Sequence, residues 1–141
     1  NEIRSDILQK RVNLILKNKV KNKKISFLGV TFKANTDDMR DSSSLKLIPY
    51  LSKKGAQIKY YDPTGFKIEF SKLKNVKFSN SIHDSIKGSD LIIIHTEWND
   101  FKSINFRKFS KNKNLIIYDM RNIFSPDKIN KMGFKYFGIG R

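Results

Sequence analysis

The 141-residue chain contains no cysteine, which excludes disulfide bonds, thiolate metal sites and cysteine nucleophiles within this stretch. Its two histidines, His83 and His95, lie far apart in sequence, which argues against a zinc site built from this chain alone. No run of about 18 apolar residues and no signal-peptide pattern is present, so we expect no membrane-spanning segment and a cytoplasmic location. Because the chain opens at Asn1 rather than at a methionine, we expect a fragment of a longer protein.

Acidic residues are scarce relative to basic ones. The chain has 29 Lys and Arg against 13 Asp and Glu, a formal net charge of +16. Such a balance is typical of proteins that bind nucleic acid, anionic ligands or anionic membrane surfaces. The cations are mostly lysines, spread from Lys10 to Lys135 without a dense cluster, whereas nucleic-acid readers commonly use arginine forks with interleaved aromatics. We interpret the charge as a compositional bias, and a dedicated nucleic-acid-binding module stays the alternative.

Short β-rich apolar runs alternate with helical patterns along the chain. Apolar residues at helical spacing predict an amphipathic helix over 3–17, with a stripe formed by Ile3, Ile7, Leu8, Val12, Ile15 and Leu16. Strands are predicted at 25–30, 56–61, 75–79, 90–96, 114–120 and 134–140, further helices at 44–55, 81–88 and 125–133, and a helix or turn at 105–112. This alternation predicts an α/β fold, a Rossmann-like three-layer domain with a mostly parallel sheet.

Two of the predicted helices, at 44–55 and at 3–17, have features that an ordinary helix of such a domain would not have. Pro49 falls inside the helix predicted at 44–55, where proline removes a donor and clashes with the preceding turn. We therefore expect this helix to start late enough to place Pro49 in its first turn, or to bend there. The helix at 3–17 looks like an appendage, and we interpret it as a connector from an upstream domain.

The end of the first predicted strand is dense in charge, in the stretch GVTFKANTDDMRDSSSL. Ligands of open α/β sheets bind beyond the carboxyl ends of strands, where backbone amides and a helix start favour anions. Lys33 supplies a mobile charge and Arg40 a planar fork for phosphate, while Asp37, Asp38 and Asp41 can fix these cations or cap the helix. A phosphate-bearing ligand is therefore favoured, and a solvated turn with surface ion pairs is the alternative. The fingerprint G-x-G-x-x-G is missing, so we expect no standard NAD cradle on this sheet.

Five segments, taken in order, resemble the C-terminal domain of the UDP-glucose/GDP-mannose dehydrogenase family. They are the stretch quoted above, GAQIKYYDP, HTEWNDF, YDMRNIF and the terminal FGIGR, and the resemblance covers residues 24–141. The combination of Thr96-Glu97-Trp98 with Arg121-Asn122 looks most like the UDP-glucose 6-dehydrogenase branch. Relatives that act on GDP-mannose or on UDP-N-acetyl sugars share the first segment, so these substrates stay alternatives.

The resemblance implies a division of labour among three domains. An N-terminal Rossmann domain binds NAD, a helical central domain mediates dimerisation, and the C-terminal α/β domain helps to hold the UDP-sugar. Such enzymes oxidise the sugar C6 alcohol to the acid in two hydride transfers, with two NAD and a catalytic cysteine upstream of this domain. On this basis residues 1–20 are the end of the connector helix, residues 24–141 are the UDP-sugar-binding domain, and this fragment holds no catalytic residue. A homodimer is implied for the full-length protein.

The resemblance also implies roles for individual residues. Phe32 and Lys33 match a Phe-Lys pair that contacts the UDP-sugar. Arg121 matches an arginine that contacts the UDP-sugar and is supplied from the neighbouring subunit, and Arg40 matches one that reaches NAD across the interdomain cleft. This agrees with the choice of Lys33 and Arg40 from charge and position, and it adds Arg121. One departure is Met120, because the family usually has glycine there, and this bears on the backbone geometry around Arg121.

Other residues at strand ends and in helices receive structural roles or none. We assign Trp98 to packing, Glu97 to a structural role because no partner for a general base is evident, and Asp119 to capping a turn. His83 and His95 receive no role, although either could titrate near neutrality. Two further hypotheses stay open: a non-catalytic basic module that binds polyanions, and an anion-binding regulatory domain that has lost its enzyme.

Overall fold

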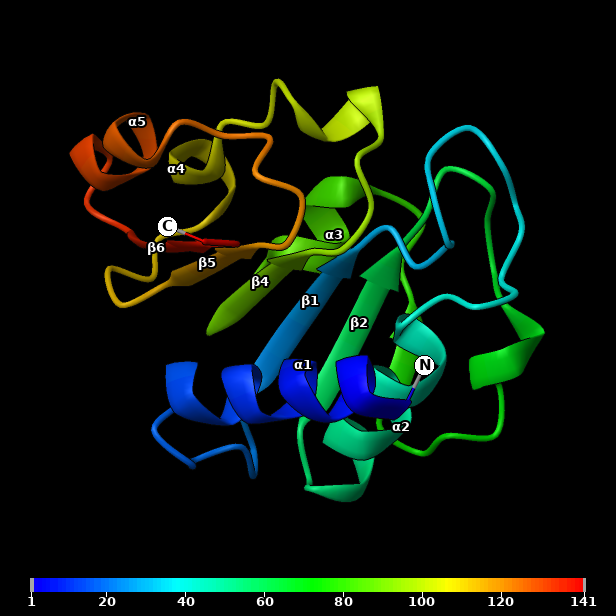
Figure 1. The fold of residues 1–141 in the computed structure, drawn as a ribbon. Helices are drawn as coiled ribbons and strands as arrows, with labels where there is room; N and C mark the ends of the chain where they lie inside the picture. The colour runs from blue at the N-terminus through cyan, green and yellow to red at the C-terminus, as the bar shows by residue number, and fades with distance from the viewer. Residues whose placement is uncertain (1, 141) are drawn as a thin grey trace.

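Six parallel strands form one sheet in the order β3-β2-β1-β4-β5-β6 (Figure 1). The computed structural model describes residues 2–140 of the chain, and the side chains of residues 5–108 and 110–140. The strands are β1 (Lys24–Leu28), β2 (Gln57–Tyr61), β3 (Val76–Phe78), β4 (Leu91–Ile94), β5 (Ile116–Asp119) and β6 (Lys135–Gly138). Every pairing between neighbours is parallel, which confirms the predicted sheet and all six predicted strands.

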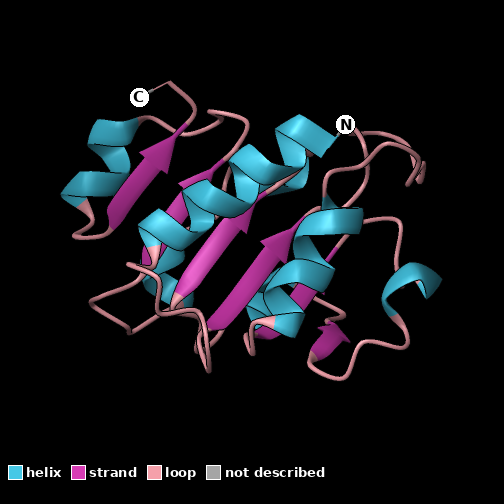
Figure 2. Ribbon diagram, turned by 60° about the horizontal axis from the view of Figure 1, so that its bottom comes forward, coloured by secondary structure: helices cyan, strands magenta, loops and turns pink. Residues whose placement is uncertain are grey.

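Helices cover both faces of the sheet and give the predicted three layers. They are α1 (Glu2–Ile15), α2 (Ser44–Lys53), α3 (Ile82–Ile86), α4 (Phe106–Phe109) and α5 (Pro126–Lys131). Helices α1 and α2 lie across one face, as Figure 2 shows. Two short 3₁₀ helices, η1 (Ile68–Phe70) and η2 (Asn99–Phe101), were not predicted. Helix α5 lies within the segment predicted at 125–133, where Ser125 caps it and Pro126 is its first residue.

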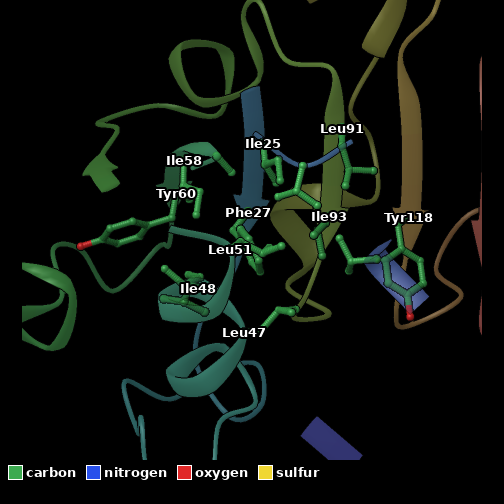
Figure 3. Packing of buried hydrophobic residues seen from close by; sticks show 14 of the residues in the cluster. Ile25, Phe27, Leu47, Ile48, Leu51, Ile58, Tyr60, Leu91, Ile93 and Tyr118 are labelled. Carbon is green, nitrogen blue, oxygen red and sulfur yellow. The ribbon is translucent and has the colours of Figure 1, made fainter. Parts of the chain in front are cut away.

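The strand β4 contributes to a hydrophobic core on each side of the sheet. Leu91 and Ile93 belong to the cluster under α1 and α2, where Leu51 also packs (Figure 3). Ile92 and Ile94 point the opposite way, into the cluster under α3, α4 and α5. Successive strand residues face opposite sides, so a strand buried on both faces reads as a continuous apolar run. This explains why the most apolar run of the sequence is a central strand.

Helix α1 packs on the sheet and shares its core with α2. Leu8, Val12 and Ile15 are buried, whereas Ile7, which the predicted stripe included, is 54% exposed. That part of the prediction is wrong, because Ile7 lies about 100° around the helix from Leu8 and so off the buried line. The side chain of Ile3 lies outside the described residues. The assignment of residues 1–20 to a connector from another domain stays a prediction.

Pro49 lies in the interior of α2, as the sixth of its residues, and not in the first turn. The expectation that the helix would begin late enough to place Pro49 there is therefore wrong. Leu47, Ile48 and Leu51 are all buried against the sheet from the same helix. Their burial holds the helix in place around the proline, since tertiary packing overrides local propensity.

Gly29 lets the chain turn sharply where β1 ends. Its φ is +79°, a left-handed conformation that favours glycine. A Cβ atom at this position would lie 2.5 Å from Cβ of Thr96, which is fully buried after β4. Glycine is therefore required here both by backbone conformation and by the close approach of two strand ends.

Replacing Gly29 by alanine should destabilise the domain by roughly 3 kcal/mol, because left-handed strain and overpacking add together. Gly65→Ala is the matched control, since Gly65 has φ +94° but no described atom within 4 Å of its Cβ position. The control should lose about 1 kcal/mol from strain alone. Urea unfolding of both variants beside the wild type measures the difference. Equal losses would show that the approach to Thr96 imposes no constraint.

Candidate functional site

The strand order changes direction next to β1. From β1 the chain runs outward to β2 and β3, then crosses to β4 on the other side of β1 and continues to β5 and β6. The connections that follow β1 and β4 therefore diverge at the carboxyl edge of the sheet. Open α/β sheets bind their ligands at such a switch point. The charged stretch found in the sequence forms the loop after β1 and the start of α2.

Side chains from both sides fix this loop to the sheet at Val30. Its N–H donates to Oδ2 of Asp62 at 2.8 Å, and Asp62 is 1% exposed at the end of β2. Its carbonyl accepts from the hydroxyls of Ser42 and Ser44, each at 2.6 Å. Val30 at the start of the loop is thereby bonded both to the end of β2 and to the serines at the start of α2, so both ends of the loop are held beside the strand ends.

Arg40, predicted to hold a phosphate, is engaged by Asp38. Nε and Nη2 of Arg40 donate to the two carboxylate oxygens of Asp38 at 3.0 and 3.1 Å. These hydrogen bonds lower the pKa of Asp38 below its ordinary value, and the same contact raises the pKa of Arg40. The Arg40 side chain is 88% exposed, so the pair lies in solvent on the loop. Asp38 thus fixes a cation as predicted, while Ser43 rather than an aspartate occupies the N-cap position of α2.

A cavity of about 590 Å³ lies between the loop after β1, the start of α2 and the turn after β5. Phe32, Lys33 and Arg121, the three predicted substrate contacts, line it together, whereas Arg40 does not. The other lining residues are Ser5, Asp41, Ser42, Ser43, Leu45 and Lys46. Among the described residues of the wall, three cationic side chains and one carboxylate give a net positive charge, which favours an anionic ligand.

Two backbone carbonyls orient the guanidinium of Arg121. Nε donates to the carbonyl of His95 at 2.9 Å, and Nη2 donates to that of Phe32 at 3.2 Å. Among the described residues the remaining guanidinium N–H groups have no partner, so they are available to an anion in the cavity. The missing family glycine does not distort this arrangement, because the left-handed residue here is Asn122, at φ +53°, and not Met120.

Asp119 supports the turn that carries Arg121. It is fully buried, and Oδ1 accepts from the backbone N–H of Arg121 at 3.1 Å. Oδ2 accepts from the N–H of Phe124 at 2.9 Å and from the hydroxyl of Tyr136 at 2.8 Å. The predicted turn-capping role of Asp119 is confirmed by these contacts.

A chain of polar side chains that sequence reasoning missed lies against the cavity. Oγ of Ser43 lies 2.8 Å from Nε2 of His95, and Nδ1 of His95 lies 3.0 Å from Oγ1 of Thr96. Thr96 in turn donates to the carbonyl of Thr31 at 3.0 Å. His95 is 1% exposed and received no role from the sequence. The available signal was its place directly after the most apolar strand, at the switch point.

The remaining candidates do not line the cavity. Trp98 is 8% exposed within the cluster under α3, α4 and α5, which agrees with a packing role. Glu97 and His83 are exposed. Within residues 2–140, no group of three His, Cys, Asp or Glu side chains could hold a metal ion. In the same part of the chain, no helix is long and apolar enough to cross a membrane.

Arg40→Gln should raise the pKa of Asp38 toward its ordinary value of 3.8, because the guanidinium hydrogen bonds are the largest cause of its lowering. Since the folded pKa lies below the unfolded one, the pair stabilises the loop above the unfolded pKa. That contribution is lost as the pH falls through the folded pKa. An NMR titration of the Asp38 carboxyl carbon in both proteins measures the shift. The same pKa in both proteins would contradict the assigned cause.

Residues 26–126 match the family model of the UDP-glucose/GDP-mannose dehydrogenase family, UDP binding domain. The chain is 33% identical over 142 residues to the UDP-glucose 6-dehydrogenase of Rhizobium meliloti, covering 100% of this chain and 32% of that protein. It is 34% identical over 128 residues to the UDP-glucose 6-dehydrogenase YwqF of Bacillus subtilis, covering 86% and 28%. The chain thus spans about a third of the length of the curated relatives it matches.

Solved structures share the fold over nearly the whole chain. One is an NDP-N-acetyl-D-galactosaminuronic acid dehydrogenase from Methanosarcina mazei, with a TM-score of 0.79 and 25% identity over 99% of this chain and 29% of that chain. Another is a UDP-D-ManNAc dehydrogenase from Pyrococcus horikoshii, with a TM-score of 0.71 and 29% identity over 99% and 30%. These likenesses agree with the Rossmann-like architecture.

Proposed function

The chain belongs to the UDP-glucose/GDP-mannose dehydrogenase family, and on this premise we propose that it is the nucleotide-sugar-binding domain of an NAD-dependent UDP-glucose 6-dehydrogenase. The full-length protein oxidises UDP-glucose to UDP-glucuronate in this proposal. The relatives of Rhizobium meliloti and Bacillus subtilis support this branch by their names. The catalytic cysteine and the main NAD site belong to domains outside this chain, which contains no cysteine.

One observation carries the proposal: Phe32, Lys33 and Arg121 line a single cavity. Phe32 and Arg121 are 89 positions apart in sequence, yet Nη2 of Arg121 donates to the Phe32 carbonyl. The resemblance implied that Arg121 reaches the ligand of a neighbouring subunit. Because Arg121 lies beside Lys33 of its own chain, we propose that both hold the same UDP-sugar.

The cavity suits a ligand that carries two phosphates. Its volume lies within the range of small-molecule sites, and its cations are Lys33, Lys46 and Arg121. Charge-assisted hydrogen bonds to phosphate oxygens contribute roughly 1.5–3 kcal/mol each. Phe32 is 46% exposed and offers a ring face to a base or a sugar. Binding energy gathered on the remote UDP can then orient the sugar C6 for reaction.

In this proposal NAD binds mainly to another domain and contacts this chain only at its edge. The glycine fingerprint is missing, and Arg40 is the one residue proposed to contact the cofactor. Its guanidinium is exposed and bonds Asp38 through Nε and Nη2, so its other N–H groups can donate to a phosphate of NAD. NAD accepts the hydride when bound, and this chain contributes a positive charge at its edge.

We keep N-acetylated nucleotide sugars as a second candidate substrate class, because solved structures of similar fold are named for them. The two solved structures described above are named for an N-acetylated sugar or for an N-acetylated uronic acid, and both align with nearly the whole chain. The same cavity would then hold UDP or another nucleoside diphosphate while the sugar differs.

The test is NADH formation by the full-length parent protein, with UDP-glucose, UDP-N-acetyl sugars and GDP-mannose supplied separately. We expect about two NADH per UDP-glucose, because oxidation of an alcohol to an acid releases two hydrides. Turnover only with another nucleotide sugar would leave the family assignment unchanged and would replace UDP-glucose as the proposed substrate. A folded protein that oxidises none of them would overturn the proposal and leave polyanion binding as the next hypothesis to test.

Arg121→Ala in the full-length protein should lower kcat/KM for the nucleotide sugar by roughly ten- to a hundredfold, the loss of one charge-assisted contact. Arg121→Lys should restore little, because an ammonium lacks the planar fork that bonds two carbonyls and an anion together. Lys77→Ala, on the edge strand β3, removes the same charge away from the cavity and should leave turnover unchanged. If Arg121→Ala showed the kinetics of the wild type, the assignment of Arg121 as a substrate contact would be wrong.

A further inference from the structure

Three serines open α2, and the middle one departs from the usual local pattern. Ser42 and Ser44 bond the Val30 carbonyl, so their hydroxyls serve the backbone. Ser43 directly precedes the helix with helical backbone angles (φ −64°, ψ −19°), and the N–H of Ser44 is accepted at 3.3 Å by the hydroxyl of Ser42. Within the described residues, Oγ of Ser43 bonds no helix N–H and lies 2.8 Å from Nε2 of His95. A serine on a cavity wall that bonds a buried histidine and not the local backbone is a candidate for function.

When the imidazole of His95 is neutral, the contacts of these side chains determine which atom donates each hydrogen bond. Thr96 has one hydroxyl proton, and it is directed to the Thr31 carbonyl, which can only accept. Oγ1 of Thr96 must therefore accept from Nδ1 of His95. In the neutral imidazole with Nδ1 protonated, Nε2 is an acceptor, so the Ser43 hydroxyl donates to it. The lone pairs of Ser43 Oγ are then its only free hydrogen-bonding capacity.

The cavity wall therefore combines two kinds of hydrogen-bonding group. Lys33, Lys46 and Arg121 are donors, which suit the oxygens of a phosphate. Ser43, held in this way, is an acceptor, which suits a hydroxyl or an N–H and not a phosphate oxygen. His95 contributes to both kinds, because its imidazole accepts from Ser43 and its carbonyl accepts from Nε of Arg121.

We propose that Ser43 is a specificity-determining residue of this cavity, whose Oγ accepts a hydrogen bond from a hydroxyl or N–H group of the bound nucleotide sugar. His95 is a positioning residue, which keeps the Ser43 proton turned away from the ligand. This inference rests on the proposed function, since it names the chemistry of one contact to that ligand. A nucleotide sugar without a donor at this place leaves Ser43 Oγ unpaired and binds less well.

The first experiment measures equilibrium binding of UDP and of UDP-glucose to the full-length protein. Ser43→Ala should weaken binding roughly three- to tenfold, the range of one neutral hydrogen bond. Ser43→Thr, which keeps the hydroxyl, should stay within about twofold of the wild type. Weakening of both ligands places the donor on the uridine part, and weakening of UDP-glucose alone places it on the sugar. Unchanged binding of both ligands would overturn the proposal. Ser103→Ala, at an exposed turn, is the control.

The second experiment separates positioning from packing at His95. His95→Phe removes both ring nitrogens but keeps an aromatic ring beside Phe27 and the backbone carbonyl that holds Arg121. If His95 acts through Ser43, the double variant with Ser43→Ala binds no more weakly than Ser43→Ala alone. Additive losses would show that His95 acts through packing, and would remove its positioning role.

The third measurement does not depend on any ligand. Imidazole nitrogen NMR shifts of the full-length protein, assigned with His95→Phe, should show Nδ1 protonated and Nε2 unprotonated. A proton on Nε2 would overturn the acceptor assignment of Ser43 even if binding is normal. Failure of the proposed function is recognised separately, because the wild type would then bind none of the nucleotide sugars tested.

Discussion

The polar groups of one residue, Val30, set the geometry on which the rest of the site depends. Asp62 accepts from its N–H, and Ser42 and Ser44 donate to its carbonyl, so the backbone of this one residue joins the end of β2, the loop and the start of α2. A carboxylate that is 1% exposed would be costly to bury without such partners. The loop therefore enters and leaves at fixed points, and Lys33 and Ser43 are carried to the same cavity.

A second buried carboxylate does the equivalent work on the other side of the switch point. Asp119 holds the turn after β5 through two backbone N–H groups and the hydroxyl of Tyr136. Arg121 extends from this turn back to the carbonyls of His95 and Phe32, and so links three strand ends. Buried side-chain acceptors thus replace regular backbone pairing where the sheet stops. This is the expected solution where loops must be both irregular and rigid.

The fold could be predicted from the sequence because its signals are local. The run that became β4 is apolar on both faces, and the start of α5 carries both cap residues. Ile7 was wrongly predicted to be buried, since it directly precedes Leu8 in sequence and therefore lies about 100° around the helix from the buried side chains. The site was predicted in part: Lys33 stands in a charged loop, but Arg121 needed the family resemblance. The pair formed by Ser43 and His95 could not be predicted, because it joins residues 52 positions apart through the register of the finished sheet.

The cationic side chains of the cavity differ in how much conformational freedom they have before a ligand binds, and this difference affects how an anion would bind. Arg121 is partly buried and held by two carbonyls, so its guanidinium is oriented before a ligand arrives and little rotamer freedom remains to be lost. Lys33 is exposed on a flexible stem, so it adds attraction at a distance but must be ordered on contact. In the proposed complex, a phosphate would thus be positioned by the arginine and attracted by the surrounding lysines. An excess of lysine across the surface raises the second contribution without changing the first, so the net charge of this chain does not by itself identify an anionic ligand.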